Sequence, residues 1–222
     1  MKAGVLGIVH GSFDAVDSYS ETVTQEGYDL DRCLEINRIF SLPTGGMGFA
    51  GRAAETTLAD ETVTTIEHGE INVSKRTRPH TQYTEFVGIP GEFVVAKSGD
   101  GTFAFDLIEA ETATDIERAT LDLDGFYRAN GSATPWKAGF FGSGDESVNG
   151  IVHGEDLRQS HDLDDVLSNS TLNQIGLTDD YEGSEMKMMA TRSGYVQVYQ
   201  PSEFEVGQFL EYLREEIVQY GI

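Results

Sequence analysis

Two histidines occupy the fourth position of identical pentapeptides, and acidic residues that suit metal binding follow each of them. Gly-Ile-Val-His-Gly occurs at residues 7–11 and 150–154, each time at the end of an apolar run. His10 is followed by Asp14, and His153 is followed by Asp156. Imidazole nitrogens and carboxylate oxygens are the ligands that Zn²⁺ or Mn²⁺ would take. Neighbouring strands would therefore bring these four residues together as a metal site.

Acids are abundant along the whole chain, so a carboxylate near each histidine is expected without any metal. We therefore favour a simpler interpretation, in which both histidines end strands that face water. The metal site remains the basis of an alternative function, a metal-dependent hydrolase that uses the two strand-end histidines. The sequence identifies no other cofactor.

A basic cluster interrupts this acidic chain, and residues 71–84 contain no acid at all. Its members are Lys75, Arg76, Arg78 and His80. Fixed cations on an exposed segment could contact an anion such as a phosphate group, and Tyr83 could stack on a base. Affinity of this kind falls steeply with salt, so pairing with the chain's own acids, or a linker at residues 75–84, is the favoured alternative.

Glycines at 46, 48 and 51 match the G-x-G-x-x-G pattern of dinucleotide-binding loops, with Glu70 nineteen residues beyond the last glycine. Pro43 and Thr44 interrupt any strand that would run into these glycines, and the following helix, expected at 52–59, is too short for a crossover. A flexible glycine loop is the better interpretation. The signatures G-x-S-x-G, G-x-x-x-x-G-K-[ST] and H-E-x-x-H are absent, so the corresponding enzyme classes lack support.

The net charge indicates the surroundings in which the chain folds. There are 38 acids and 15 bases among 222 residues, a formal charge of -23, and both halves of the chain are acidic. Such a chain repels itself in dilute salt, whereas molar salt screens the repulsion to about 3 Å. We therefore predict a halophilic protein. A lone cysteine and the lack of a long apolar run favour a soluble, cytoplasmic location over secretion or a membrane.

The hydrophobic pattern in the N-terminal part predicts four elements. A buried strand is expected at 2–10, a helix at 29–40, and a hairpin at 62–66 and 71–74 around His68-Gly69. The segment at 75–84 is expected to be an exposed connection.

From residue 92 onwards, the pattern predicts three hairpin–helix (ββα) units, beginning near 92, 136 and 185. The expected hairpins are 93–97 with 102–109, 136–142 with 148–154, and 186–191 with 195–199, followed by helices from about 114, 162 and 202. We therefore expect an α+β fold in which an antiparallel sheet carries its helices on one face. Residues 1–81 would form a small α+β region and residues 82–222 the repeat domain, unless the two are continuous.

These observations favour a non-catalytic binding or assembly protein. Its hairpin edges, or the basic segment, would meet a protein partner or a second copy of the chain, and a phosphate-bearing ligand would bind only weakly.

Overall fold

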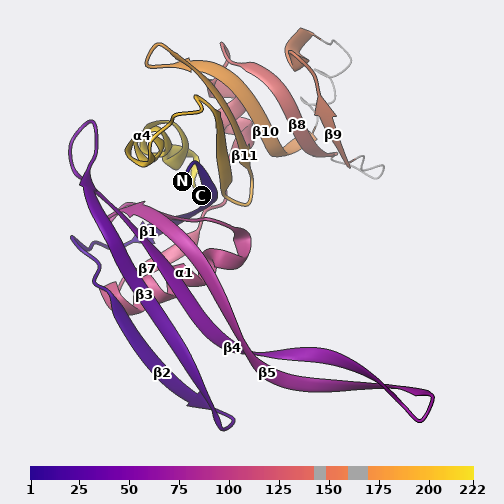
Figure 1. Cartoon of the computed structure of the whole chain (residues 1–222). Helices are drawn as coiled ribbons and strands as arrows, with labels where there is room; N and C mark the ends of the chain where they lie inside the picture. Colours follow the sequence, from indigo (N-terminus) through magenta and orange to yellow (C-terminus); the bar gives the residue numbers. More distant parts are fainter. Residues whose placement is uncertain (143–148, 160–169) are drawn as a thin grey trace.

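The protein is built around one large antiparallel sheet (Figure 1). The computed structural model describes residues 1–142, 149–159 and 170–222. In this part of the chain the strands follow the order β2-β3-β4-β5-β6-β1-β12-β11-β10-β8-β9, and β7 also pairs with β1. The strands are β1 (Ala3–His10), β2 (Tyr19–Gln25), β3 (Tyr28–Ser41), β4 (Met47–Glu67), β5 (Glu70–Ile89), β6 (Phe93–Ala96), β7 (Asp115–Arg118), β8 (Thr134–Gly142), β9 (Asn149–His153), β10 (Ser170–Tyr181), β11 (Ser184–Thr191) and β12 (Tyr195–Gln200).

Three short α-helices accompany the sheet in the described residues. They are α1 (Phe103–Thr112), α2 (Leu123–Ala129) and α4 (Val206–Tyr212). The chain after α4 continues through a π-helical turn, Leu213–Ile217, and a 3-10 turn, Val218–Tyr220. None of the described helices has both the length and the apolar character needed to span a bilayer.

The predicted α+β fold built from three ββα units is wrong, because the molecule is mostly an open antiparallel sheet. In the first expected unit, residues 103–112 form α1 instead of a strand, and the helix expected from residue 114 begins with β7. Four buried residues of α1 follow helical spacing, Ala104, Phe105, Leu107 and Ile108, although this segment was expected to be the second strand of a hairpin with residues 93–97. The helix expected near 162 lies outside the described residues. At the C-terminus, β11, β12 and α4 do lie where a hairpin and a helix were expected.

The helix predicted at 29–40 is also wrong, because this segment forms β3. Cross-strand partners on both sides account for the difference. Thr22 and Thr24 of β2 donate hydrogen bonds to acids of β3, and Arg32 of β3 forms an ion pair with Glu55 of β4 at 3.1 Å. Such pairs stabilise a sheet but involve residues distant in sequence, so local periodicity does not reveal them.

Two further local predictions are corrected by the long strands β4 and β5. Residues 75–84 form part of β5 rather than a linker, and the glycines at 48 and 51 lie within β4 rather than in a flexible loop. A Cβ atom at Gly51 would lie 2.3 Å from the carbonyl oxygen of Glu35, so this glycine permits a close approach between β4 and β3. The predicted hairpin around His68-Gly69 is confirmed as the tip of the β4–β5 pair.

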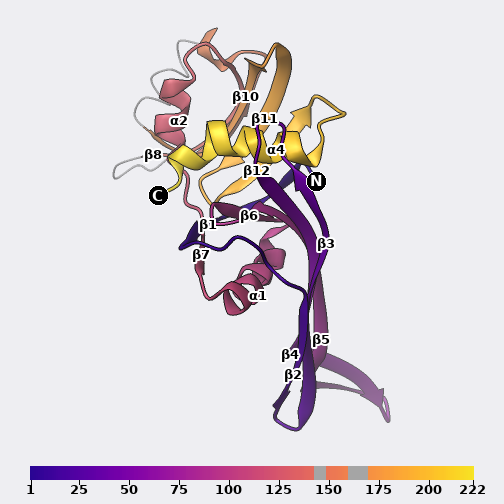
Figure 2. The same cartoon turned by 90° about the vertical axis from the view of Figure 1, so that its left-hand side faces the viewer.

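Helices lie on both faces of the sheet, which corrects the expectation of helices on one face (Figure 2). The central strand β6 shows this arrangement directly. Phe93 and Val95 belong to a hydrophobic cluster with residues of α2 and α4, whereas Val94 and Ala96 belong to a second cluster with residues of α1. A strand covered on both sides needs apolar residues at every position, which explains the continuous Phe-Val-Val-Ala sequence of β6.

The expected division between residues 81 and 82 falls inside β5. The N-terminal strand β1 pairs with β6 on one side and with β12 on the other. The sheet therefore runs through both of the expected regions.

Candidate functional sites

The structure does not bring the four expected metal ligands together. His10 ends β1 and His153 ends β9, and four strands, β12, β11, β10 and β8, lie between β1 and β9 in the sheet. Five strand spacings amount to about 24 Å, far beyond the reach of two imidazoles around one ion. Among the described residues, no group of three or more histidine, cysteine, aspartate or glutamate side chains could hold a metal ion.

His10, Asp14 and Asp156 lie in different surroundings in the structure. His10 Nε2 lies 3.8 Å from the exposed carboxylate of Glu117 on β7. Asp156 accepts hydrogen bonds from the backbone N–H of Arg158 and from the side chain of Gln159, and so closes a short turn. Asp14 is exposed in the segment between β1 and β2. The repeated pentapeptide therefore marks two strand ends on different parts of the sheet.

The basic cluster lies on an exposed ribbon formed by β4 and β5. We call residues 56–81 the arm. Here β4 and β5 pair only with each other, because β3 pairs with β4 no further than Glu55 and β6 pairs with β5 only from Phe86 onwards. Figures 1 and 2 show the arm extending away from the rest of the sheet. Within the described part of the chain, both of its edges therefore carry backbone groups without a strand partner.

The pairing register separates the basic side chains onto two faces of the arm. Arg76, Arg78 and His80 alternate along β5 and share one face, whereas Lys75 lies on the other. Arg78 forms an ion pair with Glu61 at 2.9 Å, and the other three basic residues form no ion pair with any residue that the structure describes. Pro79 fits this strand because β5 has a single neighbour at that position.

The tip of the arm exposes apolar side chains. Ile66 and Ile71 face each other across the hairpin and are 76% and 71% exposed, and Val73 lies beside them on the same face. Isolated side chains of this kind are common on protein surfaces, but here they gather at the end of a two-stranded ribbon. Such a ribbon is only marginally stable in water without a third strand or a packed face.

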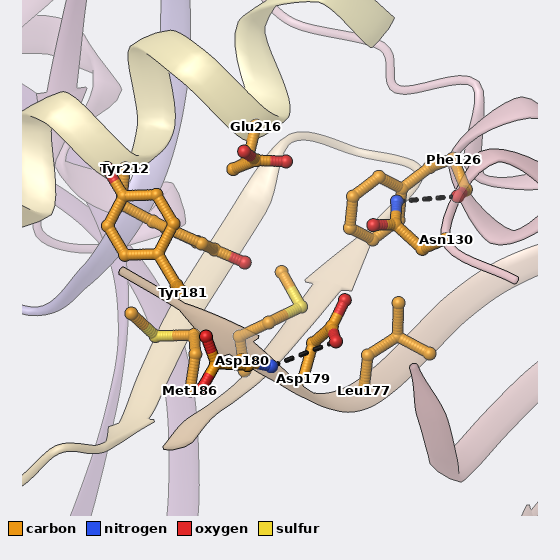
Figure 3. Close-up of a pocket in the computed structure, with 10 residues that line it drawn as sticks. Phe126, Asn130, Leu177, Asp179, Asp180, Tyr181, Met186, Tyr212 and Glu216 are labelled. Atoms are coloured by element: carbon orange, nitrogen blue, oxygen red, sulfur yellow. Dashed lines mark hydrogen bonds between the residues drawn. The ribbon is translucent and has the colours of Figure 1, made fainter. Parts of the chain in front are cut away.

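A second candidate site is a cavity of about 150 Å³ between the β10–β11 hairpin, α2 and the C-terminal helix (Figure 3). Its apolar lining consists of buried side chains from three elements. They are Phe126 of α2, Leu177 of β10, and Met186 and Met188 of β11. Tyr181 and Tyr212 form another wall, packed edge to face with ring centroids 5.1 Å apart.

The polar groups around this cavity are mainly acceptors. The carboxylates of Glu216 and Asp179 approach the cavity from the helix and from the sheet (Figure 3). Burial, together with the neighbouring charges of Glu215 and Asp179, raises the pKa of Glu216. Burial also raises the pKa of Tyr181, as does the hydrogen bond of its hydroxyl to Glu215 at 2.7 Å, so the phenol stays neutral.

One hydrogen-bonded network holds α2 beside this cavity. The carboxylate of Asp124 accepts a hydrogen bond from the backbone N–H of Leu172 at 3.1 Å and one from the guanidinium of Arg192 at 2.9 Å. Arg192 also donates to the carbonyl oxygen of Leu172 at 3.0 Å. The first turn of α2 is thereby tied to β10 and to the turn that follows β11, which places Phe126 at the cavity wall.

Sequence reasoning missed this cavity because its residues come from three separate segments, around 126–130, 177–188 and 212–216. The only local signal is the Asp-Asp-Tyr sequence at the end of β10, and acids are too frequent in this chain for that signal to stand out. No protein-family model matches the chain, and no curated protein is significantly similar to it.

Proposed function

We propose that this protein is a non-catalytic assembly protein, and that its arm binds a second copy of the same chain. The observation that carries the proposal is a long ribbon that leaves the sheet with apolar side chains at its tip and with neither edge paired to another strand of residues 1–142, 149–159 or 170–222. Burying the tip and pairing an edge would supply the third strand or the packed face that an isolated ribbon lacks.

Charge favours another copy of this chain as the partner. The arm contains four acids and three bases, a net charge of -1, so the remainder of the chain carries -22. The basic stretch of β5 would therefore meet a complementary acidic surface on any second copy. A nucleic acid fits less well, because the acidic body would repel phosphates and because salt weakens phosphate contacts.

Concentrated salt and a cytoplasmic location belong to the same proposal. Molar salt would screen the repulsion between two acidic bodies, and contacts of the apolar tip are not weakened by salt as ion pairs are. A cytoplasm rich in potassium chloride is the compartment that this combination implies.

The test is the mass of the particle in solution, measured by light scattering during size-exclusion chromatography in about 2 M potassium chloride. The wild-type chain is expected to form an oligomer. In a shortened variant, an Asn-Gly turn joins Thr57 to His80 in place of residues 58–79. This variant should fold, because the native pairing of Thr57 with His80 is retained, and it should be a monomer, because most of the arm is missing.

A charge variant tests the role of the basic face separately. Arg76→Glu with Arg78→Glu should weaken association, whereas Arg118→Glu with Arg128→Glu makes the same change of charge at exposed positions of the body and should not. A monomeric wild-type chain, or an unchanged oligomer after shortening of the arm, would contradict the proposal.

A further inference from the structure

The hydroxyl group of Tyr212 is the most informative polar group in the cavity between the β10–β11 hairpin, α2 and the C-terminal helix. Tyr212 is only 5% exposed, and its hydroxyl has no hydrogen-bond partner among the residues that the structure describes. Figure 3 shows the side chain directed from the helix into the cavity. The hydroxyl therefore lies at the cavity surface, where a ligand could form a hydrogen bond with it.

The other polar groups around the cavity indicate which type of ligand could bind there. Asn130 Nδ2 donates to the carbonyl oxygen of Phe126 at 2.9 Å, which leaves Asn130 Oδ1 as an acceptor toward the cavity (Figure 3). Asp179 and Glu216 add carboxylate oxygens, and neither forms an ion pair with a described basic residue. A surface made of acceptors requires a ligand that donates hydrogen bonds, and two carboxylates favour a positive charge.

The size and walls of the cavity favour an organic cation over a bare ion. A volume of about 150 Å³ is roughly ten times the space that one ordered water needs. Six of the ten lining residues are aromatic or aliphatic, including Phe126, Leu177 and Met188. Aromatic and apolar walls suit the carbon atoms and the delocalised charge of an organic cation, whereas a metal ion needs a closer set of oxygen ligands.

We propose that this cavity is a binding site for a guanidinium or primary ammonium group carried by an organic molecule. Glu216 and Asp179 supply the counter-charge, Tyr212 and Asn130 accept further hydrogen bonds, and the apolar wall contacts the alkyl chain. The cationic group can belong to a free small molecule or to the side chain of a peptide. The site does not depend on the arm, so it stands even if the protein is a monomer.

Binding is tested with the full chain and two probes, agmatine and a short neutralised peptide containing a single arginine. The ionic strength is held constant with potassium chloride. The ¹³C-methyl NMR signals of Met186 and Met188, which line the cavity, should shift and saturate with agmatine. Saturation by the peptide as well would identify a protein side chain as a ligand, and saturation by agmatine alone would identify a free small molecule.

Single substitutions locate the binding. Glu216→Gln and Asp179→Asn should each weaken agmatine binding at least about tenfold, and Tyr212→Phe, which keeps the ring, should weaken it about threefold or more. Glu185→Gln is the matched control, because it removes one charge from an exposed position of β11 outside the cavity lining and should change affinity less than about twofold.

Three results would overturn the proposal. One is the absence of a saturable shift with agmatine up to about 1 mM. Another is an equal shift with neutral butylurea or with added potassium chloride alone, because a cationic organic group would then not be what is recognised. The last is an equal loss of affinity in Glu216→Gln and Glu185→Gln.

Discussion

The strands β4 and β5 run from the centre of the sheet into the arm, but their side chains are buried in the centre and exposed in the arm. In β6 and the paired residues of β5, side chains are buried on both faces, and Phe93 and Val94 are fully inaccessible. In the arm, β4 and β5 keep the same pairing with each other, while nearly every side chain from residue 60 onwards reaches water. Backbone pairing alone therefore does not require a core; burial is what distinguishes the two regions.

The two regions also differ in the amino-acid composition of their strands. Residues 86–89 and 93–96 are apolar at almost every position, whereas residues 56–65 of the arm are rich in threonine, whose β-branched side chain suits an extended backbone without demanding burial. We infer that the centre supplies the stability of the protein and that the arm is available for contacts outside it.

The largest expected effect compares one apolar side chain from each region. Phe93→Ala would leave a cavity between β6 and the helical layer and should reduce the free energy of unfolding by about 3–5 kcal/mol. Ile71→Ala at the tip of the arm should change the stability of a single chain by less than about 0.5 kcal/mol, because Ile71 is exposed within one chain. Urea denaturation of both variants at a protein concentration low enough to keep the chain monomeric measures the contrast, and similar losses would show that the tip packs against its own chain.

The next effect concerns the point where β4 leaves the centre of the sheet. Gly51→Ala would place a Cβ atom 2.3 Å from the carbonyl oxygen of Glu35, so β3 and β4 must separate, at an expected cost of about 1–3 kcal/mol. Gly69→Ala at the tip meets no atom within 4 Å and costs only the strain of its positive φ, about 1 kcal/mol. Thermal unfolding should rank the two variants in this order; the reverse order would contradict the close approach at Gly51.

Salt should act on the body of the molecule rather than on the arm. Raising potassium chloride from about 0.1 to 2 M should stabilise the chain by on the order of 1–2 kcal/mol, equivalent to a rise of roughly 2–8 °C in Tm. The arm-shortened variant should show the same dependence, because the arm contributes only -1 to the charge of -23. A Tm that is equal in dilute and concentrated salt would refute the role of surface charge.

The smallest effect is the pH dependence that Glu216 contributes. Its raised pKa means that the folded state binds a proton more tightly than the unfolded state, so stability from this group is present at low pH and declines as pH rises from about 4.5 through the raised value. Glu215 and Asp179 carry the negative charges that face it, and Tyr181 and Tyr212 remain neutral. Glu216→Gln should therefore be slightly more stable than wild type at pH 7, and the two proteins should be equally stable near pH 4. The gain at pH 7 should be less than about 1 kcal/mol, because Glu216 is partly exposed. Unfolding curves at the two pH values test the sign, and a loss of stability at pH 7 would reverse it.

Local signals in the sequence predicted some elements correctly. The apolar run of β1, the His68-Gly69 turn and the amphipathic helix after residue 205 are each specified by neighbouring residues, so short-range patterns were sufficient. The strand β3 was missed because Leu30, Leu34 and Ile36 also fit a helix, and only pairing with Glu55 and its neighbours in β4 decides between the two.

The candidate sites depend even more on tertiary structure. The basic residues of β5 are visible in the sequence, but their display on an isolated ribbon follows from where β3 and β6 stop pairing. The cavity needs Asn130, Asp179 and Tyr212 to converge from three segments, and no spacing rule along the chain predicts that. Expecting a metal site at His10 and His153 required the two strands to be neighbours, which the strand order shows they are not.

The length of the arm has a consequence for the symmetry of any assembly. Twelve residues in each strand give the arm a reach of about 40 Å, so it can touch a neighbour whose body lies well away from its own. If the arm of each molecule binds the body of the other, both binding surfaces are occupied and the particle is a closed dimer. If each arm instead binds the body of a third molecule, the contacts run head to tail. Such an assembly closes into a ring only when the rotation between neighbouring subunits divides a full turn evenly, and any other rotation produces a filament.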